Sequence, residues 1–382
     1  MTTSLISFAS LALALALVAA PSSAHGAGGL DQGVQPAASE AASDAERRPF
    51  HDSVLIWDHS VTTQTLGIGA DYQSRNPTYE MTLRLAPRYY LIDDAARSLS
   101  VRADVRLVRE FTNSDTTTER GEWDFADSEL SLLDAETIAA TSQNRTQLVL
   151  RAPILTFPTS KASALGGRIL GLGAGVGLDQ YLTLRGETAS VLRAVLVRPR
   201  VNYSYEFVDA EVATNDRIDR IRLDSDGRSA PSDQLSGAAF TQHQLNLSAR
   251  ADLELARSLT FVSEFGMRYG YRYRQREAVE MCLSTGCAEV PGRADATRWG
   301  VSTLFAVSLD YEINHTFELS AGYLNLSPQL GADGRRRSVF YSPEARAFLA
   351  LGISLDSLYR QLRGQTTDEP LRSANRALSA RF

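Results

Sequence analysis

Apolar residues alternate with small, polar or charged residues through most of the segment 259–274, and this alternation constrains the fold more than any other feature. One side carries apolar and aromatic residues: Leu259, Phe261, Phe265, Met267, Tyr269, Tyr271 and Tyr273. The other side carries small, polar and charged residues: Thr260, Glu264, Gly266, Arg268, Gly270, Arg272 and Arg274. A repeat of two residues indicates a β-strand whose two faces meet different surroundings. We therefore predict a strand here with one apolar face.

The same pattern recurs between residues 60 and 360. We predict strands at residues 62–73, 78–91, 98–111, 128–140, 145–157, 169–184, 190–207, 238–253, 259–274, 297–313, 316–326 and 345–359. A soluble β-sandwich turns its apolar faces inward, whereas an outer-membrane barrel turns them outward to lipid. Short links alternate with long polar links along the chain, as periplasmic turns and extracellular loops do in such barrels. The predicted fold is all-β: an antiparallel up-and-down transmembrane β-barrel of about 12 strands with long extracellular loops.

Aromatic residues cluster at the ends of the predicted strands. The clusters are Tyr72 with Tyr79, then Tyr203, Tyr205 and Phe207, and finally Tyr269, Tyr271 and Tyr273. Aromatic residues favour strands in general, which is the simpler explanation. Their placement near the long links favours an aromatic girdle, where the apolar band of a barrel meets water.

The first residues have the pattern of an export signal. An apolar run at 11–20 is followed by Ser22, Ser23 and Ala24, which predicts a signal peptide at 1–24 that is cleaved after Ala24. A short membrane anchor is the alternative, although the run is too short to span a bilayer comfortably.

The remaining chain divides into three predicted parts. Residues 25–59 are expected to form a mature N-terminal linker, 60–360 the barrel, and 361–382 a periplasmic C-terminal tail. Within the linker, Val54–Trp57 is a short apolar run that fits an edge strand or a plug against the barrel.

Alternation, aromatic strand ends, link lengths and signal peptide together resemble those of bacterial outer-membrane β-barrel proteins. The resemblance is architectural and covers residues 60–360. It implies a location in the outer membrane of a Gram-negative cell, contact with outer-membrane lipid, and insertion by the outer-membrane assembly machinery. The chain departs from the pattern at its end, because its last predicted strand stops well before Phe382.

The predicted inward face collects charged residues. The residues expected to line the lumen are Arg84, Arg88, Arg102, Arg106, Arg198, Arg200, Arg268, Arg272, Glu264 and Asp310. Charged rings select the solutes of a channel, whereas opposed charges also fill and close a narrow barrel as ion pairs. The favoured hypothesis is a narrow channel that passes small polar or charged solutes through an Arg-lined lumen. The alternative is a closed structural barrel whose long loops, chiefly 209–237 and 275–296, bind an extracellular partner.

Four glycines alternate with apolar residues on one predicted strand. Gly171, Gly173, Gly175 and Gly177 all fall on its inward face. They fit two interpretations equally well. Either they leave room for a bulky group, such as an arginine from another strand, or they mark a sharply curved part of the wall.

Other function classes receive little support. A net charge of −6 offers no polybasic surface for nucleic acid. An outer-membrane hydrolase would need a base, and His243 is the one histidine on a predicted membrane strand, but no catalytic motif accompanies it. Asp224 and Asp226 start a calcium-like pattern that does not continue, so a solvated loop is preferred. We expect no enzyme activity, cofactor or metal site.

The chain has two cysteines, Cys282 and Cys287. In an exported chain, two cysteines with four residues between them predict a local disulfide that closes a loop. A metal site would need further ligands, and no histidine lies nearby.

Overall fold

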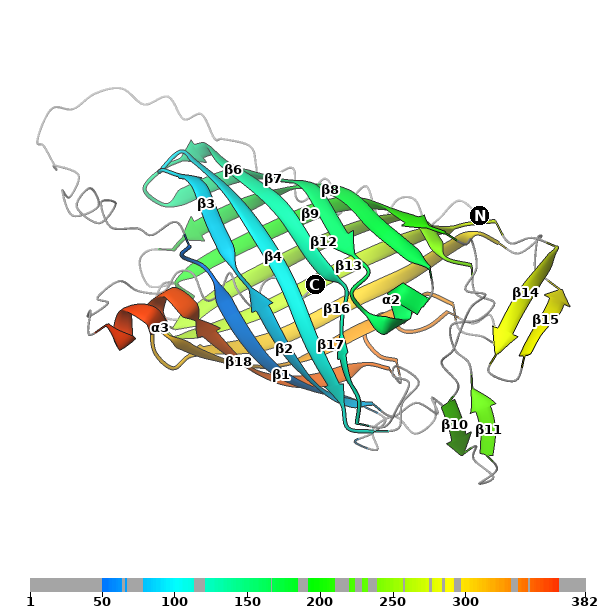
Figure 1. Ribbon diagram of the computed structural model, residues 1–382. Helices are drawn as coiled ribbons and strands as arrows, with labels where there is room; N and C mark the ends of the chain where they lie inside the picture. Colours follow the sequence, from blue (N-terminus) through cyan, green and yellow to red (C-terminus); the bar gives the residue numbers. More distant parts are fainter. Residues whose placement is uncertain are drawn as a thin grey trace, which may run out of the picture. The chain divides into compact units, whose positions relative to one another are not determined.

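The computed structural model describes residues 50–63, 66, 78–112, 121–165, 167–184, 192–209, 220–223, 229–232, 239–256, 258–274, 277–283, 286–291, 297–330, 336–342 and 344–363. Within these residues, antiparallel strands form the wall of a closed 12-strand barrel (Figure 1). The wall elements are β1 (Val54–Thr62), β2 (Tyr79–Ala86), β3 (Arg88–Asp93), β4 (Arg97–Glu110), β6 (Ser128–Ala140), β7 (Asn144–Phe157), β8 (Arg168–Thr183), β9 (Ala194–Val208), β12 (Thr241–Ala256), β13 (Leu259–Arg272), β16 (Trp299–Glu312), β17 (Phe317–Pro328) and β18 (Arg346–Ser354).

Strands that follow one another along the wall are hydrogen-bonded neighbours, and the last closes on the first. β18 pairs with β1 over the whole of β1, from Ser354 opposite Val54 to Arg346 opposite Thr62. β2 and β3 both pair with β4 and together make one wall strand, interrupted at Pro87. Because the wall closes, the sheet has no free edge, as a membrane-spanning sheet requires.

The remaining elements lie in the links. A short strand, β5 (Trp123–Phe125), pairs with β4, and α2 (Lys161–Leu165) lies between β7 and β8. Two hairpins, β10 (Arg220–Leu223) with β11 (Ser229–Ser232) and β14 (Ala278–Leu283) with β15 (Gly286–Pro291), fall within the predicted links 209–237 and 275–296. A helix, α3 (Leu355–Leu362), follows β18.

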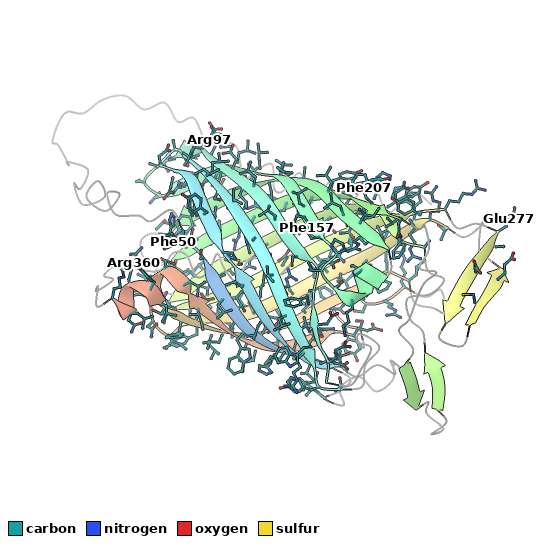
Figure 2. The ribbon with its side chains drawn as sticks, in the orientation of Figure 1. Phe50, Arg97, Phe157, Phe207, Glu277 and Arg360 are labelled. Atoms are coloured by element: carbon teal, nitrogen blue, oxygen red, sulfur yellow. The ribbon has the colours of Figure 1, made fainter. Side chains whose placement is uncertain are left out.

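The wall strands turn an apolar face outward and a polar face inward. In β9, Val201 and Tyr203 are exposed, whereas Arg198 is buried. The same rule holds for exposed apolar side chains on other strands: Leu85, Leu172, Val176, Phe265, Leu309, Leu319 and Leu349. Figure 2 shows side chains all along the outside of the wall, Phe157 and Phe207 among them. An exposed apolar band around a closed barrel is suited to lipid, and the chain is therefore an outer-membrane β-barrel.

Aromatic side chains gather at the wall-strand ends that meet the longer links. Ring contacts occur between Tyr79 and Phe111 at 5.1 Å, Tyr205 and Phe207 at 4.7 Å, and Tyr271 and Trp299 at 4.9 Å. Tyr273 donates a hydrogen bond to the carbonyl oxygen of Glu206 at 2.6 Å. Amphipathic rings are stable at this height, where hydrocarbon meets water. Tyr72, predicted to belong to this group, lies outside the described residues.

The first described strand begins earlier than the sequence pattern indicated. We predicted a strand at residues 62–73, most of which lie outside the described residues, whereas β1 spans Val54–Thr62 and begins before the expected start of the barrel at residue 60. The alternation is hidden because Val54 and Ile56 face inward and pack with Ala86 and Ala350 in an apolar cluster. With both faces apolar, the start of β1 has no period of two.

The last strand is shorter than predicted. Residues 345–359 were expected to be one strand, but β18 ends at Ser354 and α3 follows. Asp356 lies in the first turn of α3 and Arg360 in the last, with their side chains 3.6 Å apart. This order of charges suits the helix dipole, and the spacing of Leu355, Leu358, Tyr359 and Leu362 is helical. The strand prediction therefore extended too far.

Several predicted features lie outside the described residues. These are the signal peptide at 1–24, the linker up to residue 49, the calcium-like residues Asp224 and Asp226, and the tail beyond residue 363. Among the described residues, none of the helices is long and apolar enough to cross a membrane.

Candidate functional site

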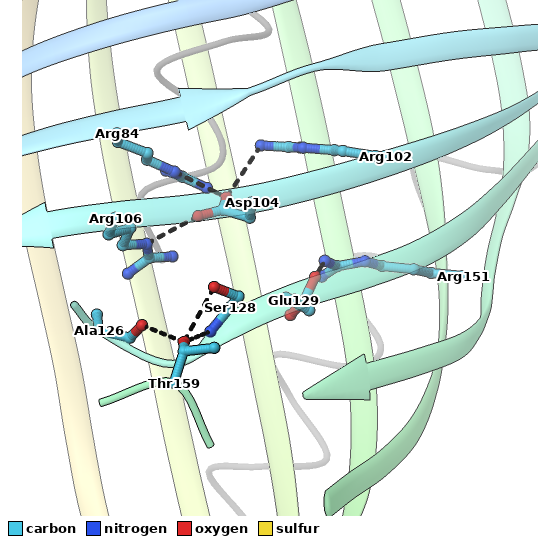
Figure 3. A network of polar contacts seen from close by, with 9 residues as sticks. All are labelled: Arg84, Arg102, Asp104, Arg106, Ala126, Ser128, Glu129, Arg151 and Thr159. Carbon is cyan, nitrogen blue, oxygen red and sulfur yellow. Dashed lines mark hydrogen bonds and ion pairs between the residues drawn. The ribbon is translucent and has the colours of Figure 1, made fainter. Parts of the chain in front are cut away.

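A first network of charges lies on the inward face of β2 and β4. Asp104 is bound by Arg84, whose Nε lies 2.7 Å from Oδ2, and by Arg106, whose Nε lies 2.9 Å from Oδ1. Arg102 approaches the same carboxylate, with Nη2 3.7 Å from Oδ2. Figure 3 shows Asp104 between the three guanidinium groups. β4 supplies three of these residues because 102, 104 and 106 alternate onto one face, and register places Arg84 opposite Arg106.

Two further pairs extend this network along the wall. On β6 and β7, Arg151 bonds to Glu129, and its Nε donates to Ser131 Oγ at 3.2 Å. On β3, Arg88 lies 3.6 Å from Asp52 and donates to Ser100 Oγ at 2.9 Å. Each side chain that leaves water thus gains a polar partner, as burial requires.

A second network lies on β8, β9, β12 and β13. Asp252 bonds to Arg198 and accepts a hydrogen bond from Arg250 Nε at 2.7 Å. Glu264 lies beside the same two arginines. Arg198, Arg250 and Asp252 each expose less than a tenth of their side chains. Such burial makes this network a rigid part of the barrel interior.

Arg200 extends the second network across β8. Its guanidinium bonds to Asp179 and donates to the carbonyl oxygen of Leu178 at 2.7 Å. A Cβ atom on Gly177 would clash with Arg200 Cδ, and one on Gly175 would clash with Asn202 Oδ1. The glycines therefore make room for side chains of β9 that cross β8. This is the first of the two interpretations offered for the glycine repeat.

The other predicted lumen residues stand apart from these networks. Arg268 donates to Asn246 Oδ1 at 3.1 Å, and Arg272 is exposed at the end of β13. Asp310 is buried on β16, where Ser308 and Ser320 donate to its Oδ1 at 2.9 and 2.6 Å. The inward alternation thus places the arginines on one face but divides them among separate groups.

Several partners were not foreseen from the sequence. Asp52 precedes the first strand, and Glu129 and Asp179 lie near strand ends, so none was assigned to the inward face. Arg346 bonds to Glu80 across β1, between residues far apart in the chain. These pairs depend on the register between neighbouring strands, and the residue pattern within one strand carries no information about that register.

His243 lies on the outward face within the aromatic band. Its Nδ1 is 2.7 Å from the hydroxyl oxygen of Tyr203, and its ring contacts Tyr205 and Tyr271. A second histidine is placed similarly, since His59 Nδ1 lies 3.0 Å from Tyr79 Oη. These contacts describe a polar group held among interfacial tyrosines.

Cys282 and Cys287 are directly opposite one another in the β14–β15 pairing. This register brings the two backbones to the positions that a cross-strand pair occupies. Among the described residues, no group of three histidine, cysteine, aspartate or glutamate side chains is arranged to hold a metal ion.

Comparison with known proteins finds similarity in structure alone. No protein-family model matches the chain, and no curated protein matches it significantly. The chain is similar to an outer membrane channel from Pseudomonas putida F1, with 11% identity, 81% of this chain and 96% of that chain covered, and a TM-score of 0.44. It is also similar to the NanC porin, with 10% identity, 79% and 98% covered, and a TM-score of 0.35. A third similar structure is LpxR from Salmonella typhimurium, with 10% identity, 79% and 100% covered, and a TM-score of 0.33.

Proposed function

We propose that this outer-membrane barrel is a narrow channel that passes small polar or charged solutes through an Arg-lined lumen. The observation that carries the proposal is the exposure of guanidinium groups on the inward face. The side chains of Arg106 and Arg151 are 40% and 31% exposed, although they belong to charge networks inside the wall. Inward groups that still meet solvent can act on a passing solute, and charges of this kind set the selectivity of pores.

A closed barrel is the second candidate, and a different observation favours it. Arg84, Arg198 and Arg250 are almost fully buried, and the apolar cluster around Ile56 is buried on the inward face of β1. Ion pairs and apolar side chains of this kind fill small barrels. In that case the long links would carry the function by binding a partner outside the cell.

Ion conductance across a planar bilayer separates the two candidates. Purified, folded protein should give steady single-channel steps, and Arg268→Ala should change the ion selectivity because it removes an inward cation. Arg97→Gln serves as the control, since Arg97 lies at the far end of β4 in an exposed pair with Asp134. A silent bilayer, with protein whose electrophoretic mobility still shifts on boiling, would reject the channel and favour the closed barrel.

The disulfide and the export route belong to the same proposal. We propose that Cys282 and Cys287 are bonded in the β14–β15 hairpin, outside the cell, and that residues 1–24 are removed during export. The barrel would then meet outer-membrane lipid and require the assembly machinery for insertion. A membrane-impermeant thiol reagent added to intact cells should label neither cysteine until a reductant is supplied. Rapid labelling without reductant would contradict the bond.

A further inference from the structure

The two inward charge networks differ in their balance. In the second network, Arg198, Arg200 and Arg250 face Asp179, Asp252 and Glu264, so three cations meet three anions among the described residues. The charges of this buried set are balanced within it. We therefore assign it to the stability of the barrel.

The first network carries more positive than negative charge. Its four guanidinium groups share two described carboxylates: Arg84, Arg102, Arg106 and Arg151 against Asp104 and Glu129. The neighbouring carboxylates are engaged with other groups. Asp52 pairs with Arg88, Glu80 pairs with Arg346, and Asp58 also acts on Arg346. Glu110, further along β4, accepts a hydrogen bond from Thr112.

Arg102 is at the centre of this excess. Arg84, Arg88 and Arg151 repel its positive charge, and Asp104 attracts it. That carboxylate is already bound more closely by Arg84 and Arg106. An excess of partly buried positive charge raises the free energy of a barrel unless an anion from solution lies beside it.

The geometry allows an anion to approach. Arg84 is buried behind Asp104, but the side chains of Arg102, Arg106 and Arg151 are 19%, 40% and 31% exposed. Figure 3 shows Arg102 and Arg106 on either side of Asp104, and Arg151 on a nearby strand. A guanidinium group that meets solvent can bind the oxygens of a carboxylate or phosphate through paired hydrogen bonds.

We propose that Arg102, Arg106 and Arg151 form an oxyanion-binding site in the lumen, with small solutes that bear a carboxylate or phosphate as its ligands. The inference rests on the proposed function, because solutes must reach the inward face. The inference adds two things to the proposed channel: a preference for anionic solutes, and a binding site for them within the lumen. Asp104 acts as a positioning residue, since its carboxylate bonds Arg106 and lies 3.7 Å from Arg102, and Arg84 holds that carboxylate in place.

Calorimetric titration of the folded, detergent-solubilised protein tests the site. Sodium citrate and inorganic phosphate are the probes, titrated at constant ionic strength against sodium chloride. We expect saturable binding to the wild-type protein. Binding of citrate but not phosphate would indicate a carboxylate site, and binding of both would indicate a general oxyanion site. Arg102→Gln and Arg106→Gln should each weaken binding about ten-fold, because each removes one charged hydrogen-bond donor. Arg97→Gln is the matched control and should bind as the wild type does.

Two results would overturn the inference. One is an absence of saturable binding to wild-type protein that is shown to be folded by its shift in mobility on boiling. The other is unchanged affinity in both glutamine variants. Arg106 is the more exposed of the two, so Arg106→Gln keeps the test valid if Arg102→Gln does not fold. This titration and the conductance measurement can fail independently. If the barrel binds citrate but conducts no ions, the oxyanion site is supported and the channel proposal is rejected.

Discussion

Asp252→Asn is expected to lower the free energy of unfolding by about 3–5 kcal/mol, the cost of leaving buried charges without their partner. Asp252 holds both Arg198 and Arg250, and all three side chains are less than a tenth exposed. The asparagine keeps the shape of the side chain but removes its charge, so two guanidinium groups would share one neutral oxygen. Urea unfolding of the protein in lipid vesicles, followed by tryptophan fluorescence, measures the change.

Asp134→Asn is the matched control for that substitution. Asp134 also pairs with an arginine, Arg97, but the two side chains are 26% and 48% exposed. Exposed ion pairs contribute between zero and about 1 kcal/mol, so the control should unfold close to the wild type. Equal losses for the two variants would show that Asp252 is not in a low-dielectric interior.

Val201→Arg is expected to destabilise the barrel by about 2–4 kcal/mol, because it places a charge on the lipid face near the middle of the bilayer. Val201 lies at the centre of β9, is exposed, and is paired on either side with Val176 and Leu247. Unfolding in vesicles by urea again measures the loss, and the folded fraction after reconstitution gives an independent value.

Val195→Arg is the control for depth on the same strand and the same face. Val195 is the second residue of β9, at the strand end opposite Tyr203, Tyr205 and Phe207, so arginine there can reach the headgroups. The expected loss is about 0–1 kcal/mol. If arginine is tolerated equally at both positions, the outward face of β9 does not lie against hydrocarbon.

Strands with one apolar and one polar face could be predicted closely. The strand predicted at 128–140 has the same bounds as β6, although Asp134 and Glu136 interrupt its outward face. Asp134 lies at the middle of β6, but it is paired with Arg97 at the first residue of β4, and both side chains stay partly exposed, so the interruption costs little. The period of two is a local property, and it is therefore visible in the sequence.

Elements whose environment depends on distant residues could not be predicted this way. The start of β1 is apolar on both faces, because Ile56 packs against Ala86 and Ala350. The helix α3 follows directly on the apolar strand β18. In the sequence, only the helical spacing of its apolar residues distinguishes it from a continuation of that strand. In the candidate site, the inward arginines could be assigned by alternation, but their division into a balanced and an unbalanced network depends on register between strands.

Passage of solutes into proteoliposomes tests the central claim most directly. Vesicles containing the folded protein are diluted into isotonic solutions of small polar solutes, and light scattering follows their swelling. The account predicts swelling that is fast for the smallest solutes and slows as solute size increases, because the lumen is narrow and lined by charged side chains. Vesicles with equally folded protein that swell no faster than protein-free vesicles, for every solute, would contradict it.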